Sequence, residues 1–213
     1  MLTTERLHLR PFTAGDAQDF LGLASHWDVA RMTSDIPHPL TLADARQWLQ
    51  PAPDEARFAL IEDGLLIGGA GYFLQSGGAV ELGFWLGRAY WGRGLATEAV
   101  KAVVAYGLRH DRTPAFTSSH FTDNPASGRV LAKLGFEPTG TARIRSIARG
   151  TDVAAICYWL SAEQAAARLG LEAPLLEAPL PKASLPKASL QRAERTGRPR
   201  RLASLFGRLT RSA

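Results

Sequence analysis

The chain has 213 residues, of which 46% are hydrophobic and 21% are charged. This composition is ordinary for a globular protein and excludes a chain that is disordered throughout. Its length fits one domain of about 100–200 residues with an appendage, and we expect a folded domain over residues 1–161 and a separate segment over residues 162–213. The net charge of +5 belongs to that segment, because residues 1–160 hold 15 basic and 16 acidic residues whereas residues 161–213 hold 10 and 4. We therefore expect no specific DNA binding by the folded part.

Four elements are predicted before residue 50. In order they are a short strand ended by Pro11, a helix begun near Thr13, a loop-rich lid over residues 25–39 and a second helix capped by Thr41. Both threonines are followed three residues later by aspartate, an arrangement close to a capping box. The lid shows no steady hydrophobic period, which is typical of a loop.

Three strands in succession are predicted over residues 57–61, 65–74 and 79–86, with Asp63-Gly64 as a two-residue hairpin turn between the first two. The pattern then changes to a helix over residues 95–108, a strand over 115–121, a helix over 125–134 and strands from 136 to 160. This order mixes hairpin connections with crossovers through helices. It predicts an α/β domain with a mixed sheet and helices on both of its faces.

The C-terminal segment, rich in proline, alanine and arginine, differs in kind from the rest. Residues 180–190 hold the sequence Leu-Pro-Lys-Ala-Ser twice over, and such a composition buries too little surface to offset an ordering entropy of about 1–2 kcal/mol per residue. We expect a short helix after residue 162 and disorder from Pro174 onward. Near the end, apolar residues recur at helical spacing among arginines: Leu202, Leu205, Phe206 and Leu209. That pattern is consistent with a basic amphipathic helix in weak contact with an anionic membrane, RNA or a partner groove, and equally with an inert arginine-rich tail.

Gly92 and Gly94 stand at the junction between a predicted strand and the helix over residues 95–108. The first turn of a helix has free backbone N–H groups and about half a positive charge, so it attracts anions such as phosphate, and glycine lets them approach the backbone. Two glycines before a helix also form ordinary tight turns. The segment lacks the Gly-Lys-Ser/Thr sequence of a Walker loop, and no βαβ unit surrounds it as a dinucleotide site requires.

Longer motifs extend this signal. The sequence carries four blocks in order: Thr4-Glu5-Arg6-Leu7-x-Leu9-Arg10, Glu81-Leu82-Gly83-Phe84-Trp85-Leu86, Tyr90-Trp91-Gly92-Arg93-Gly94-Leu95-Ala96-Thr97-Glu98-Ala99 and Lys133-Leu134-Gly135-Phe136. Together they resemble the GNAT superfamily of acyl-CoA-dependent N-acyltransferases, in particular its branch of ribosomal-protein N-terminal (alanine and serine) acetyltransferases. The resemblance covers residues 2–160 and implies the GNAT fold, a mixed, mostly antiparallel sheet with helices on both faces.

The resemblance also implies that acetyl-CoA is the co-substrate. Its pyrophosphate would lie on the turn formed by Arg93, Gly94, Leu95, Ala96 and Thr97. Trp91 replaces the Gln or Arg that is usual in the superfamily pattern, a departure that leaves the phosphate-binding backbone intact. The pantetheine arm would lie like an additional strand beside Phe84, Trp85 and Leu86, and Asn124 would contact it.

Two residues are candidates for proton transfer. Glu81 would act as general base, as an acidic residue on this strand does in parts of the superfamily, and would otherwise be a solvated carboxylate at a strand start. Ser127 would protonate the leaving thiolate, because Leu131 stands where the superfamily often has tyrosine. Helix capping alone also explains Asn124, which precedes Pro125 at the first helical position, and Ser127 at the third.

Residues of the lid are candidates for binding the acceptor. Trp27, Arg31 and Asp35 could frame an amine, and the carboxylate of Asp35 suits a cation. The same residues are equally consistent with an apolar plug that carries incidental charges.

The composition argues against a metal site and against export. Cys157 is the one cysteine of the sequence, which excludes a site with several thiolate ligands, and the five histidines show no ligand spacing. No apolar run approaches the roughly 18 residues that span a bilayer. The first ten residues alternate charge too early for a signal peptide, so we expect a cytoplasmic protein without a bound metal.

We expect transfer of an acetyl group from acetyl-CoA to a primary amine. The favoured acceptor is a protein N-terminal α-amine, whose pKa of about 7.7–8.0 makes it easier to deprotonate than a lysine with a pKa of about 10.4. A small-molecule amine such as a polyamine, an amino acid or an antibiotic is the alternative, as is a lysine side chain. A catalytically silent module that only binds acyl-CoA is a further alternative.

Overall fold

The computed structural model describes residues 1–75, 78–111 and 113–171, so the predictions about the C-terminal tail lie outside the described residues. Its strands form one sheet in the order β1-β2-β3-β4-β5-β6-β8-β7. Their bounds are β1 Leu2–Thr3, β2 His8–Pro11, β3 Glu55–Glu62, β4 Leu65–Leu74, β5 Val80–Leu86, β6 Ala115–Phe121, β7 Glu137–Ser146 and β8 Thr151–Ser161. Every neighbouring pair is antiparallel except β5 and β6, which confirms the predicted mixed, mostly antiparallel sheet.

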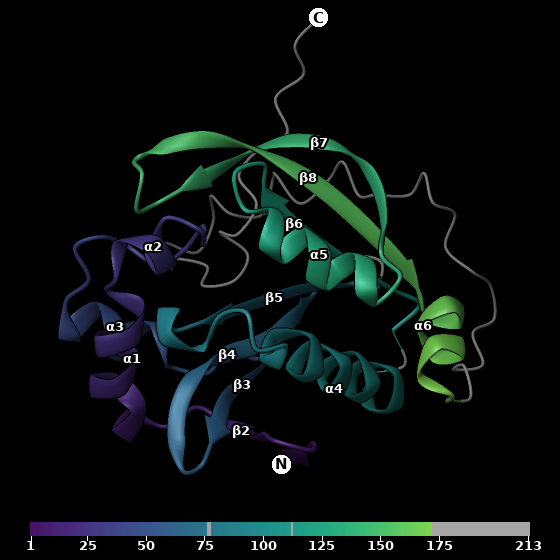
Figure 1. Ribbon diagram of the computed structural model, residues 1–213, viewed down its shortest axis with the longest axis horizontal. Coiled ribbons are helices and arrows are strands. Elements are labelled where there is room, and N and C mark those ends of the chain that lie inside the picture. The colour runs from purple at the N-terminus through teal and green to yellow at the C-terminus, as the bar shows by residue number, and fades with distance from the viewer. Residues whose placement is uncertain (76–77, 112, 172–213) are drawn as a thin grey trace, which may run out of the picture.

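The helices cover both faces of this sheet, as predicted. They are α1 Ala17–Ala24, α2 Trp27–Ala30, α3 Leu42–Trp48, α4 Leu95–His110, α5 Pro125–Lys133 and α6 Ala162–Leu169, with 3₁₀ turns η1 Ala14–Asp16 and η2 Arg88–Tyr90. In Figure 1, α1, α2 and α3 gather at one end of the molecule while α4 and α5 lie across the sheet. No helix in the described part of the chain is long and apolar enough to cross a membrane.

Alternation along β5 explains why the domain has two cores. Val80, Leu82 and Leu86 point to one face and join the larger cluster with α4, α5 and α6. Trp85 points to the other face, where it packs with α1, α2 and α3. Alanines at the start of α6 are buried in the larger cluster, so this helix, which the sequence places after the folded domain, packs on the domain core.

Local chemistry produced the helix starts that the sequence predicted. Thr41 and Asp44 form a capping box at α3, and the Thr13 and Asp16 pair does the same at η1. The turn after β3 has positive φ at both Asp63 and Gly64, as a two-residue hairpin requires. The lid over residues 25–39 is not wholly a loop, because it contains the single turn of α2, and β1 was not predicted.

Candidate functional site

The central feature of the sheet is a gap that opens between β5 and β6. These two parallel strands pair only at Val80 with Phe116 and at Glu81 with Thr117. The Oγ of Ser118 donates to the carbonyl of Leu82 at 3.0 Å, which bridges the strands one step further. Beyond that point β5 keeps its pairing with β4, and its other edge has no strand partner among the described residues. The edge is therefore free to pair with another extended molecule.

A cavity of about 70 Å³ occupies this gap. Its walls come from β5, the end of β6, the first turn of α5 and the lid, together with residues of α3, β3 and β4. Five of the residues predicted from the sequence line it together: Asp35, Phe84, Trp85, Asn124 and Ser127. The other predicted residues do not line it: Trp27, Arg31, Glu81, Leu86, Arg93, Gly94, Leu95, Ala96 and Thr97.

The turn before α4 is built to expose backbone N–H groups. Gly94 is the N-cap of α4 with φ of +82°, Gly92 has φ of +75°, and no side chain caps the helix. The amide of Glu98 donates to the carbonyl of Gly94, so the three amides before it keep the free donors of a helix start: Leu95, Ala96 and Thr97. A phosphate group fits this arrangement of donors.

Side chains brace this turn from behind. The guanidinium of Arg93 makes two bonds of 2.8 Å to the carboxylate of Glu62. Arg6 donates to the carbonyl of Arg93 at 2.9 Å and forms an ion pair of 2.6 Å with Glu98. The Arg93 side chain thus fastens the turn to β3, and binding of the pyrophosphate by its backbone stays a prediction. The indole of Trp91 donates to the carbonyl of Leu86 at 2.8 Å and ties the same turn to β5.

Glu81 is the last residue of β5 that pairs with β6, so it lies at the base of the gap. The residue is 6% exposed, and its carboxyl group accepts a hydrogen bond of 2.8 Å from Nε2 of Gln75. Burial raises the pKa of Glu81 well above its usual value, and the bond from Gln75 offsets only part of that rise. Two residues further along the same face, Gly83 stands opposite Gly71, and both of these glycines line the cavity. Between Glu81 and the cavity, this face of the sheet therefore carries only the two glycines and no side chain that would block the way.

Asp35 is the buried carboxyl group of the cavity wall. The indole Nε1 of Trp48 donates to its Oδ2 at 2.8 Å, and burial raises the pKa of Asp35 to about 6. The guanidinium of Arg57 stacks over the Trp48 ring at 4.6 Å and pairs with Glu55 at 2.8 Å, so the lid side of the cavity holds charges of both signs.

At the opposite wall, Asn124 and Ser127 begin α5. The amide oxygen of Asn124 accepts from the backbone N–H of Ser127 at 3.3 Å, and its Nδ2 donates to the Ser127 Oγ at 3.0 Å. The predicted helix cap is confirmed. The hydroxyl of Ser127 still lines the cavity, so capping and a role at the cavity coexist in these two residues.

Comparison with known proteins decides the family. The model of the acetyltransferase (GNAT) domain family matches residues 6–137 of the chain. The chain belongs to the GNAT acetyltransferase family. It is 30% identical over 161 residues, which are 70% of this chain and 89% of the relative, to the uncharacterized N-acetyltransferase p20 of Bacillus licheniformis.

Two further relatives have named acceptors. The [ribosomal protein uS5]-alanine N-acetyltransferase of Escherichia coli is 35% identical over 65 residues, which cover 30% of this chain and 34% of that protein. The solved spermidine N-acetyltransferase of Vibrio cholerae, in complex with CoA and spermine, superimposes with a TM-score of 0.66 at 14% identity, over 76% of this chain and 99% of that one. The second likeness concerns the fold alone.

As a GNAT protein, the chain is an acetyl-CoA-dependent N-acetyltransferase. The free edge of β5 and the uncapped start of α4 are the features that suit an extended arm and a pyrophosphate, so the residues present fit this co-substrate. When bound, acetyl-CoA supplies a thioester as acyl donor. The described residues contain no group of three or more His, Cys, Asp or Glu side chains that could hold a metal ion.

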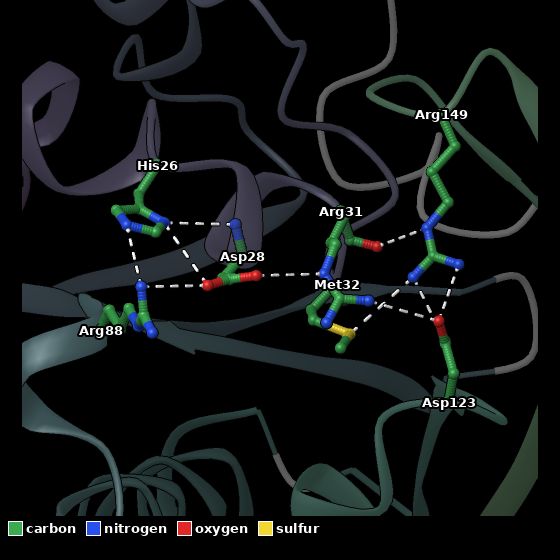
Figure 2. A network of polar contacts seen from close by, with 7 residues as sticks. All are labelled: His26, Asp28, Arg31, Met32, Arg88, Asp123 and Arg149. Atoms are coloured by element: carbon green, nitrogen blue, oxygen red, sulfur yellow. Dashed lines mark hydrogen bonds and ion pairs between the residues drawn. The ribbon is translucent and has the colours of Figure 1, made fainter.

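The lid is tied to two distant loops by charged groups (Figure 2). Arg31 forms ion pairs with Asp28 at 3.4 Å and with Asp123 at 3.5 Å. Arg149, from the β7–β8 hairpin, pairs with the same Asp123 at 2.9 Å and donates to the Arg31 carbonyl at 2.8 Å. The Arg31 side chain thus links α2 to the loop before α5. Trp27 is 44% exposed and faces the His38 ring, and acceptor binding by either residue stays a prediction.

Sequence reasoning missed several residues that line the cavity. Met32 and Thr33 reach it from the lid, Arg57 from β3 and His120 from β6. His120 carried the clearest signal, because it is a polar residue near the end of the strand that precedes Asn124. Its neighbours come from β8, which no pattern within the local sequence could have revealed.

Proposed function

We propose that the acceptor is a protein N-terminal α-amine. The observation that carries this proposal is the position of Glu81, which is buried and does not line the cavity. Proton removal by this carboxylate passes through water across Gly83. Such an indirect base suits an α-amine, which is partly neutral at pH 7, and falls short for a lysine or polyamine amine, which costs about 3 kcal/mol more to deprotonate.

Residues of the cavity divide the reaction between them. The backbone of β5 from Phe84 to Leu86 holds the pantetheine arm, and its amides near Trp85 polarise the thioester carbonyl. Glu81 takes up the proton that the amine loses. Asp35 attracts the ammonium form of the amine at the lid side of the cavity. The relative from Escherichia coli, a [ribosomal protein uS5]-alanine N-acetyltransferase, supports a protein acceptor.

A panel of acceptors tests the proposal. Peptides with free N-terminal alanine, serine, glycine or methionine are incubated with acetyl-CoA and the purified protein, and mass spectrometry locates the acetyl group. The matched control is the same peptide with a blocked α-amine and one free lysine. We expect acetylation of the α-amine at least tenfold faster than that of the lysine. Turnover of spermidine or of a lysine, with no turnover of any N-terminus, would reject the proposed acceptor.

A further inference from the structure

His120 is a buried titratable group that the reaction described so far does not use. It is the second-last residue of β6, is 8% exposed, and lines the cavity together with Asn124 and Ser127. The residue thus borders the space in which the proposed reaction places the thioester, next to the first turn of α5.

Hydrogen bonds fix the orientation of this imidazole. Its Nδ1 lies 2.8 Å from the carbonyl of Phe121, and because a carbonyl only accepts, Nδ1 carries a proton. Its Nε2 lies 3.2 Å from the hydroxyl of Tyr158 on β8. In the neutral ring the Tyr158 hydroxyl donates to Nε2, and in the imidazolium Nε2 donates to the Tyr158 oxygen. The ring is thus held in place in both charge states.

Helix α5 leaves room for the imidazole because the residue that lies against it is the glycine Gly128. A Cβ atom added to Gly128 of α5 would lie 2.6 Å from the His120 Nε2, closer than any real contact. Gly128 directly follows Ser127, so Nε2 reaches the helix beside the predicted proton donor. Leu131, at the position where a tyrosine is often found in the superfamily, is fully buried in the core and offers no proton.

We propose that His120 is a catalytic residue that protonates the sulfur of the leaving coenzyme A, with Tyr158 as its positioning residue. As the bond between the acyl carbon and sulfur breaks, its electron pair goes to sulfur, and the Nε2 proton of the imidazolium leaves its bond to the Tyr158 oxygen and goes to the same atom. Glu81 holds the proton lost by the amine, and exchange with water restores both groups. The inference rests on acyl transfer at this cavity, within the proposed function, but not on which amine is the acceptor.

Among the described residues, His120 faces the Tyr158 hydroxyl from β8 and Gly128 beside Ser127 from α5. The lid side of the cavity holds Asp35 and Arg57. A change in the pH profile of a His120 variant can therefore be separated from these two groups by repeating the measurement in the Asp35→Asn background.

The test compares His120→Gln with the wild-type protein, and His110→Gln serves as the control because His110 lies on α4 against Tyr106, away from the cavity. With a saturating acceptor we expect His120→Gln to lower kcat by about 100-fold or more, the range typical of general acid catalysis. We also expect it to abolish the alkaline limb of the kcat profile and to leave the Kd for coenzyme A within twofold. Tyr158→Phe should shift that limb without removing it.

A second readout needs no acceptor and no turnover. The thiol of bound coenzyme A is titrated through the ultraviolet absorbance of its thiolate. An imidazolium beside the sulfur should lower the pKa of that thiol in the wild-type complex, and His120→Gln should raise it by at least one unit. Gly128→Ala, which displaces the ring without removing it, should give an intermediate value and keeps the test decisive if His120→Gln does not fold.

Each outcome has one meaning. Unchanged kcat, pH profile and thiol pKa in His120→Gln would overturn the role of His120. A wild-type protein that binds coenzyme A, lowers its thiol pKa through His120 and yet acetylates no amine would instead overturn the proposed function and leave the contact intact.

Discussion

At the scale of single residues, one buried carboxyl group lines the cavity and a second lies beside it, and their environments differ. Asp35 accepts a bond from the Trp48 indole and has a pKa of about 6. Glu81 accepts a bond from the Gln75 amide, and its pKa is raised further. Separate environments give separate roles to groups of the same chemistry. In our account Asp35 attracts the amine and Glu81 removes its proton.

In Glu81→Gln the new side chain can still accept the hydrogen bond from Gln75, but it can no longer take up a proton. We predict a loss of 100-fold or more in kcat, in the range of general base catalysis, with an unchanged Kd for coenzyme A. Steady-state kinetics with the best peptide acceptor measures kcat, and calorimetry measures the Kd for coenzyme A. Glu163→Gln, on the exposed face of α6, is the matched control. A Glu81→Gln protein with wild-type kcat would show that this carboxylate is not the base.

Asp35 predicts a dependence of stability on pH. Its folded pKa of about 6 exceeds the ordinary value of 3.8, so the folded protein keeps a proton that the unfolded chain loses as the pH rises. The free energy of unfolding should therefore fall by about 2 kcal/mol between pH 4 and pH 7 from this group. Asp35→Asn keeps an acceptor for Trp48 and should remove that fall.

Urea unfolding of both proteins from pH 4 to pH 7 measures this difference. Because Glu81 is present in both, its own contribution cancels in the comparison. Parallel curves for wild type and Asp35→Asn would show that Asp35 does not hold a raised pKa in the folded state.

At the scale of elements, the main feature is the turn before α4, whose backbone is shaped by glycine. Gly94 adopts φ of +82° and so lets the first N–H groups of α4 face outward. Arg6, Arg93, Glu62 and Glu98 hold the turn in that shape. The surface that we propose for the pyrophosphate is thus backbone, and the charged side chains support it.

Comparing Gly94→Ala with a glycine substitution in another turn should separate an effect on coenzyme A binding from an effect on protein stability. Alanine in the left-handed region costs about 1–2 kcal/mol, so both Gly94→Ala and its control Gly64→Ala, at φ of +80° in the β3–β4 hairpin, should lower stability alike. Only Gly94→Ala should weaken coenzyme A binding, by tenfold or more in calorimetry. Equal affinities in the two variants would place the pyrophosphate elsewhere.

Elements that depend on neighbours in sequence were the predictable ones. Thr41 with Asp44, Asn124 before Pro125, and Asp63-Gly64 each act over one to three residues, and all three appear in the structure. The strand β1 and helix α2 were missed because two residues and a single turn leave no hydrophobic period to read.

Within the site, the sequence predicted four residues of one strand edge and one helix start that do line a common cavity, and their roles there stay predictions: Phe84, Trp85, Asn124 and Ser127. Residues brought in from other strands were not predictable. His120 is oriented by Tyr158, which lies 38 positions away in the sequence, and Arg57 comes from a strand across the sheet. Such contacts follow from strand order, which sequence patterns alone do not determine.

At the scale of the whole molecule, the sheet opens between β5 and β6, where the two strands pair over a short stretch. Antiparallel pairing on both sides fixes β5 and β6 in separate halves, and the two meet over only two residue pairs. Figure 1 shows the resulting separation, with α5 above it and α4 below. The lid then joins the halves through Asp123, Arg31 and Arg149 (Figure 2).

The central claim is that this opening and the start of α4 together hold coenzyme A. Isothermal titration calorimetry of the full 213-residue protein with coenzyme A and with pantetheine, which lacks the diphosphate, tests it most directly. We predict one molecule of coenzyme A bound per chain, and pantetheine bound at least 100-fold more weakly. No heat with coenzyme A, or equal affinity for the two compounds, would contradict the account.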